Sequence, residues 1–216
     1  MNAEISGQSE KASRIKQNYL VQAWLVILLS ICFGSALAAV QLNFGPAIEA
    51  NKLNEALEKV PELVLSADNL AKIQDKQQNL KITSQQIAVK KPAKTAYYSV
   101  YETSLNGKRE GWVIKSKGQG YADKIELLVG VDANAEKITG LYILDQKETP
   151  GLGNKIAEEK WRGQFLGKET DLALRATKAG AKSPEEINAV SGATISSNSV
   201  CAIVNTAMTD LRDKLK

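Results

Sequence analysis

The stretch TAYYSVYETSLNGKREGWVIKSK, residues 95–117, determines the fold class of this chain. Its first part, Tyr97–Thr103, is aromatic and β-branched, a composition that favours a strand. The pair Asn106-Gly107 is typical of a tight hairpin turn, and Trp112–Lys117 alternates as a returning strand. The segment therefore predicts an antiparallel hairpin.

Two more strands are predicted directly after this hairpin. They cover Lys124–Val131 and Ile138–Leu144, and the polar turn Asp132–Glu136 separates them. Connections this short imply antiparallel pairing, because parallel strands need a long crossover. The four segments together predict one antiparallel sheet.

The C-terminal third is expected to supply helices for this sheet. A short helix is predicted over Ile156–Phe165 and a fifth strand over Asp171–Thr177. Ser183-Pro184-Glu185-Glu186 is typical of a helix start, with a cap, a proline and acidic residues in the first turn. The last helix is the clearest, because its apolar residues share one face at helical spacing. These residues are Val200, Ile203, Val204, Ala207, Met208, Leu211 and Leu215. The predicted class is α+β, an antiparallel β-sheet packed with helices.

An apolar run near the N-terminus predicts one transmembrane helix before this domain. Residues 19–40 form its densest part, about the 20 residues that cross a bilayer. Lys11, Arg14 and Lys16 precede it, which favours residues 1–18 as a cytoplasmic tail. The alternative is a cleaved signal peptide, since Ala36-Leu37-Ala38 fits a cleavage site. Residues 41–95 are interpreted as a juxtamembrane helix, Ile48–Val60 ended by Pro61, and a peripheral segment.

Composition limits the chemistry. The chain has 216 residues, a net charge of +4, no histidine and two cysteines. Histidine is the usual protein ligand of haem and a common ligand of zinc, and an iron–sulfur cluster normally takes four thiolates. Lysines are scattered, and Lys90, Lys91 and Lys94 are interpreted as a solvated linker, so no nucleic-acid partner is expected. We expect no metal site and no catalytic residue, so a redox role would need an organic cofactor.

Two glycine-containing loops are candidates for binding such a cofactor. Ser191-Gly192-Ala193-Thr194 precedes the last helix, where free amides and the helix dipole favour a phosphate. The same residues could form only a turn and an N-cap, with Ser196 and Ser197 as alternative caps. The second loop follows the fourth strand and places two glycines where a planar ligand could approach the backbone. It consists of Glu148, Thr149, Pro150, Gly151, Leu152 and Gly153. Glu148 by itself is interpreted as a surface charge.

The two loops together resemble the covalent FMN-binding domain of ion-translocating electron transport complexes. SGAT followed by Ile195-Ser196-Ser197, about forty residues after ETPGLG, is similar to the G subunit of Rnf-type complexes. The C subunit of the sodium-pumping NADH:quinone reductase belongs to a related family. The resemblance implies that residues 96–216 are an FMN-binding domain, with FMN joined to Thr194 through a phosphoester. It also implies cofactor contacts from the other residues of both loops.

The resemblance implies a function and partners as well. The chain would be a membrane-anchored flavoprotein that relays electrons among other membrane subunits, with a separate flavin transferase attaching the cofactor from FAD. Its C-terminal domain would lie on the periplasmic side of the inner membrane. The chain departs from the family pattern at Asn188, where relatives have aspartate, and at Gln146, where they often have histidine. The alternatives are the C subunit of the quinone reductase and a non-redox extracytoplasmic adaptor.

Overall fold

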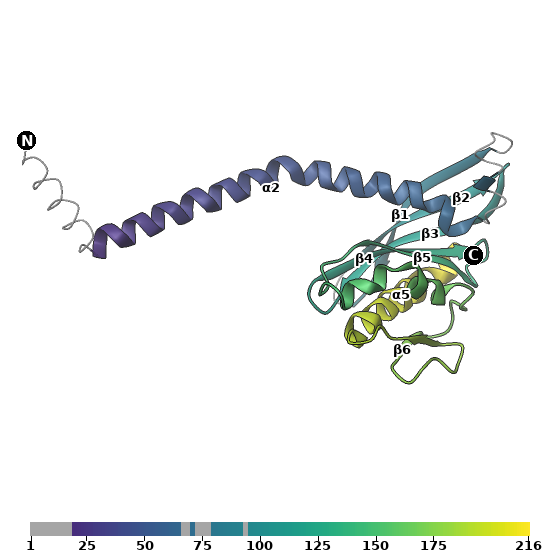
Figure 1. The fold of residues 1–216 in the computed structure, drawn as a ribbon. Coiled ribbons are helices and arrows are strands. Elements are labelled where there is room, and N and C mark those ends of the chain that lie inside the picture. Colours follow the sequence, from purple (N-terminus) through teal and green to yellow (C-terminus); the bar gives the residue numbers. More distant parts are fainter. Residues whose placement is uncertain (1–18, 66–69, 72–78, 93–94) are drawn as a thin grey trace, which may run out of the picture. The chain divides into compact units, whose positions relative to one another are not determined.

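The computed structural model describes residues 19–65, 70–71, 79–92 and 95–216. The chain divides into two compact units, Met1–Asn51 and Lys52–Lys216. The predicted cytoplasmic tail, residues 1–18, lies outside the described residues. Figure 1 shows a long N-terminal helix, a sheet and a set of C-terminal helices, in that order along the chain.

Helix α2, Tyr19–Val64, forms the described part of the N-terminal unit and continues beyond Asn51 into the second unit. The part of α2 from Val21 to Val64 is long and apolar enough to cross a membrane, judged by length and composition. The prediction of a separate helix over Ile48–Val60 is wrong, because α2 is continuous. Gly45 lacks the Cβ that would crowd the ring of Pro46, which lowers one cost of a proline inside the helix.

The second unit is built on a five-stranded antiparallel meander, in the order β1-β2-β3-β4-β5. The strands are β1 Leu80–Lys90, β2 Thr95–Leu105, β3 Lys108–Gln119, β4 Lys124–Asp132 and β5 Ile138–Asp145. Asn106 and Gly107 join β2 to β3 with φ of 51° and 82°, which are the two left-handed positions of a type I′ turn. The predicted hairpin and antiparallel sheet are confirmed, and β1 is a strand that the sequence analysis did not identify.

One face of the sheet packs against the C-terminal elements. The short helical turns η1 Gly153–Ala157, α4 Glu159–Arg162 and η2 Gly163–Phe165 replace the single helix predicted over 156–165. Helix α5, Thr194–Leu215, follows near the end of the chain. Its buried face contains all seven apolar residues that the sequence analysis identified. They belong to the main core together with β2–β5 and the turns.

The end of α2 packs on the other face. Ala56, Val60 and Leu63 form a second core cluster with side chains of β2–β5. The prediction that Pro61 ends the helix is wrong, because α2 runs to Val64 and Leu65 N still donates to Pro61 O at 2.9 Å. Burial of Val60 and Leu63 on either side of the proline holds this last turn in place.

Glycines in the sheet allow the last turn of α2 to lie close to the strands. A Cβ on Gly130 would meet the Leu63 carbonyl oxygen, and a Cβ on Gly140 would come 2.8 Å from Leu63 Cδ2. The hydroxyl of Thr139 donates to the same Leu63 oxygen at 2.6 Å, so it satisfies a carbonyl at the helix end. Helix, sheet and helix therefore form three layers within this unit, and the predicted α+β class is confirmed.

Two short parallel strands replace the helix that Ser183–Glu186 predicted. β6, Arg175–Thr177, pairs with β7, Glu186–Asn188. β6 occupies the end of the strand predicted over 171–177. The helix prediction is wrong because residues 186–188 pair with β6 and bury Ile187 in the core. The carboxylates of Glu185 and Glu186 also bind Arg175, at 3.4 Å and 2.9 Å. Ile187 is fully buried in the core.

Candidate functional site

A cavity of about 650 Å³ lies between the two glycine-containing loops and the start of α5. It has the size of a small-molecule or cofactor pocket. The lining residues come from both loops and from two segments that the sequence analysis did not select. They are Tyr121, Thr149, Leu152, Gly153, Lys178, Ala189, Val190, Ser191, Gly192, Ala193, Thr194, Ile195 and Ser196.

The SGAT loop enters α5 through a backbone turn. Gly192 has φ of +77°, a conformation that favours glycine. Ala193 donates to Val190 O at 2.9 Å and occupies the N-cap position of α5 without a side-chain hydrogen bond. Thr194 is the first residue of the helix and is half-buried in the cavity wall. The helix therefore presents its first amides and the Thr194 hydroxyl without a side-chain cap.

Ser196 and Ser197 are not the caps that the sequence allowed, because both side chains are buried. Ser197 Oγ donates to Ala193 O at 3.0 Å and accepts from Val190 N at 3.0 Å. These two bonds hold the SGAT loop against the body of the helix. Two other hydroxyls of this loop line the cavity and take no part in these bonds. They belong to the half-buried Thr194 and the exposed Ser191.

Glu148 is a buried carboxylate and not the surface charge expected from its sequence context. Only 4% of the residue is exposed. Its Oε2 accepts from Ser196 Oγ, and its Oε1 accepts from Ala122 N at 3.1 Å. Gln146 Oε1 accepts from the Glu148 amide at 2.7 Å. Glu148 thus joins the second loop to the start of α5 and to the turn between β3 and β4, and it lies behind the cavity wall.

The glycines of the second loop have different roles. Gly151 has φ of +76° and open space where a Cβ would be, so it shapes the turn. A Cβ on Gly153 would come 2.8 Å from Glu148 Cβ and 2.9 Å from Ser196 Oγ. Gly153 therefore permits protein packing behind the wall that it lines. Thr149 and Leu152 also line the cavity, whereas Pro150 and Gly151 do not.

Tyr121 and Lys178 line the cavity although the sequence analysis did not single them out. Tyr121 is 63% exposed on the turn after β3, and such an exposed aromatic residue near glycines is a signal that could have been used. Lys178 comes directly after β6, and no local pattern distinguishes it from the other lysines. Only the pairing of β6 with β7 brings it to the SGAT loop.

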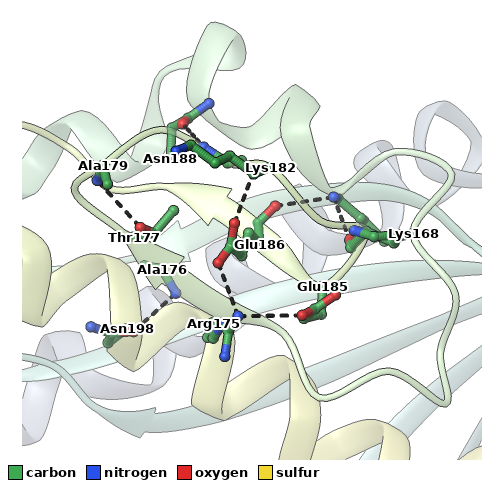
Figure 2. A network of polar contacts seen from close by, with 12 residues as sticks. Lys168, Arg175, Ala176, Thr177, Ala179, Lys182, Glu185, Glu186, Asn188 and Asn198 are labelled. Carbon is green, nitrogen blue, oxygen red and sulfur yellow. Dashed lines mark hydrogen bonds and ion pairs between the residues drawn. The ribbon is translucent and has the colours of Figure 1, made fainter.

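A polar network supports the segment that carries Lys178 (Figure 2). Arg175 binds Glu186 at 2.9 Å, and Glu186 Oε2 accepts from Lys182 N at 2.8 Å. Asn188 Oδ1 accepts a hydrogen bond from Ala181 N at 2.6 Å. The network therefore fixes the 178–182 loop to β7 through backbone amides.

Residues 120–209 match the family model of the FMN-binding domain. Every residue that lines the cavity falls inside this range. The G subunit of the Na⁺-translocating ferredoxin:NAD⁺ oxidoreductase complex of Acetobacterium woodii is 38% identical over 127 residues, covering 58% of this chain and 59% of that protein. The G subunit of the ion-translocating oxidoreductase complex of Aliivibrio fischeri is 37% identical over 112 residues, covering 50% and 53%.

The C subunit of the Na⁺-translocating NADH-quinone reductase of Vibrio anguillarum is also similar, at 29% identity over 133 residues, covering 58% of this chain and 52% of that protein. The chain spans a little over half the length of these curated relatives. NqrC of Shewanella oneidensis shares the fold, with a TM-score of 0.59 and 20% identity over 77% of this chain and 98% of that one.

The fold and the matched region agree: residues 120–209 are similar to FMN-binding domains, and the chain shares the fold of NqrC. Its resemblance to the G subunit of Rnf-type complexes, predicted from the SGAT and ETPGLG loops, is confirmed.

The residues around the cavity fit FMN. At one end, the SGAT loop offers a hydroxyl and the uncapped start of a helix, which suit a phosphate. Tyr121, Leu152 and Ile195 also line it and are 63%, 45% and 58% exposed. A planar ring in the cavity would cover part of this apolar surface. The lining therefore provides both a polar feature that suits a phosphate and exposed apolar side chains that suit a ring.

Proposed function

We propose that this chain is a membrane-anchored flavoprotein subunit of an Rnf-type ion-translocating electron transport complex, with FMN bound covalently to Thr194. The observation that carries the proposal is the position of Thr194. Its hydroxyl lies in the cavity wall, at an uncapped helix start and beside the SGAT turn. FMN, when bound, supplies the electron-transfer chemistry, and the protein supplies position and electrostatics.

Attachment requires only an accessible hydroxyl on this chain. A flavin transferase would join Thr194 Oγ1 to the FMN phosphorus of FAD as the pyrophosphate bond breaks, releasing AMP and the hydroxyl proton. Once formed, the phosphodiester would accept hydrogen bonds from the amides of the first turn of α5. A covalent bond also keeps the cofactor in place where free FMN is dilute.

The proposal places residues 19–40 in the inner membrane and residues 96–216, the FMN-binding domain, on the periplasmic side. The basic residues before the apolar run support this orientation. Relatives named as members of multi-subunit complexes support other membrane subunits as partners. A mature N-terminus at Ala39 would show a cleaved signal peptide and overturn the anchor.

Replacing Thr194 tests the attachment site. The full chain is expressed with a flavin transferase and examined by intact mass and by fluorescence of the denatured band. Wild type should gain the mass of one FMN phosphoester, and Thr194→Val should lose it because valine keeps the shape without the oxygen. Thr206→Val, at an exposed position of α5 outside the cavity, is the matched control and should remain labelled. A fluorescent Thr194→Val band would contradict the assignment, and an unlabelled wild type would favour the adaptor.

The C subunit of the sodium-translocating NADH:quinone reductase is the second candidate. Its support is the shared fold with NqrC and the 29% identity to the Vibrio anguillarum protein. Both candidates have the same attachment chemistry, so labelling cannot separate them. The proteins that co-purify with the chain from its native membrane distinguish the two.

A further inference from the structure

The cavity has a charged side chain that the two motif loops do not provide. Among the described residues that line it, Lys178 alone carries a charge. The other lining residues contribute hydroxyls, apolar side chains and backbone. An anionic group in this cavity would therefore have one side-chain cation available, in addition to the amides at the start of α5.

The start of α5 provides the other positive feature. Ala193, a poor N-cap residue, leaves the first turn without a side-chain acceptor. The hydrogen bond from Ser197 N to Ala193 O, at 3.0 Å, is the first of the helix. A phosphodiester on Thr194 would thus lie at a partial positive charge, in a cavity that Lys178 also lines.

Two backbone amides of the loop that follows Thr177 are hydrogen-bonded, one to Thr177 and one to Asn188 (Figure 2). Ala179 N donates to Thr177 Oγ1 at 3.3 Å. Ala181 N donates to Asn188 Oδ1 at 2.6 Å. A flexible lysine on a loose loop would lose more entropy when it pairs, so this anchoring favours a defined position.

We propose that Lys178 is the counter-charge of the phosphodiester on Thr194, and that Asn188 is a positioning residue that holds its loop through Oδ1. The inference rests on the proposed attachment of FMN. Asparagine and aspartate both have Oδ1, so an aspartate at this position would accept the same hydrogen bond from Ala181 N.

The effect of Lys178 should depend on whether FMN is attached. The full chain in detergent is prepared with and without a flavin transferase, and its thermal unfolding is followed by far-ultraviolet circular dichroism. In the FMN-loaded protein, Lys178→Met should lower Tm by about 2–4 °C, and added salt should reduce the difference. In unloaded protein the Tm should not change. Lys182→Met, four residues away and outside the cavity, is the matched control for both states.

An equal loss of Tm in both states would show that Lys178 is only structural and overturn the proposal, as would no loss in the loaded state. If Lys178→Met accepts no flavin, free FMN and riboflavin are titrated against the unloaded proteins. In the variant, the ratio of the affinity for FMN to the affinity for riboflavin should then be about tenfold lower than in wild type. An unchanged preference overturns the proposal.

The Asn188 variants separate the loop anchor from its charge. Asn188→Ala should lower Tm in the loaded protein as Lys178→Met does, whereas Asn188→Asp should behave as wild type because it retains the acceptor. A loss in Asn188→Asp equal to that in Asn188→Ala would contradict the role of Oδ1. An unlabelled wild type would instead show that the proposed attachment fails, which intact mass detects independently of Lys178.

Discussion

At the scale of single residues, Glu148 explains how the site is held together. Its two oxygens bind the hydroxyl of Ser196 and the amide of Ala122, which belong to different parts of the fold. A buried carboxylate is costly unless it is hydrogen-bonded, and here the two bonds stabilise it. Gly153 and Gly120 pack against its side chain and leave it room.

Replacing the Glu148 carboxylate should weaken the folded state. Glu148→Gln keeps the shape but replaces the carboxylate oxygen that accepts from Ser196 Oγ with an amide nitrogen, so this charge-assisted bond is lost. We expect a loss of about 1–3 kcal/mol in the free energy of unfolding by urea. Lys147→Gln is the matched control, because Lys147 is exposed and its ion pair with Asp123 at 3.4 Å is a surface one. Equal stability of Glu148→Gln and wild type would contradict the bridging role.

At the scale of elements, a tyrosine links β2 to α5. Tyr98 is buried and its hydroxyl donates to Asp210 on α5, which Lys91 also binds at 2.7 Å. Burial, together with the hydrogen bond to Asp210, raises the pKa of Tyr98 above its ordinary value near 10. The neutral form is therefore the one that the folded state favours.

This raised pKa predicts a loss of stability at alkaline pH. Below pH 10 the tyrosine is neutral in both states, so its contribution is fully present. As pH rises above 10, only the unfolded chain releases the proton, and the free energy of unfolding falls. Urea unfolding from pH 8 to pH 11 should show a shallower fall in Tyr98→Phe. Tyr97→Phe, at an exposed position, should follow wild type. Identical slopes in the two variants would contradict this.

At the scale of the whole molecule, the end of helix α2 is a structural layer of the second unit. Ala56, Val60 and Leu63 cover one face of the sheet, and α5 with the short turns covers the other. An antiparallel sheet with both faces apolar needs both covers. The compact unit accordingly begins at Lys52 and includes the end of α2.

Truncation should reveal this dependence. A chain of residues 52–216 retains the second core cluster, whereas a chain of residues 66–216 exposes it. The shorter chain should unfold at a lower urea concentration and show more apolar dye binding, because buried valine and leucine side chains each contribute about 1.5–3 kcal/mol. Equal midpoints for the two chains would contradict the role of this layer.

The sequence by itself determined the local elements and the two loops. Asn106-Gly107 specifies its turn through backbone preference, and the apolar face of α5 specifies its burial through periodicity. The SGAT and ETPGLG loops were found because their glycines and hydroxyls are adjacent in the chain. These features depend on interactions between near neighbours, so a local pattern reveals them.

Tertiary structure alone decided the remaining features. Pro61 lies inside α2 because Val60 and Leu63 are buried against the sheet. Glu186 joins β7 because this segment pairs with β6 and buries Ile187 in the core. Glu148 is buried, and Lys178 reaches the cavity, through partners distant in sequence. Burial and ion pairing depend on which segments meet in space, and no local pattern records that.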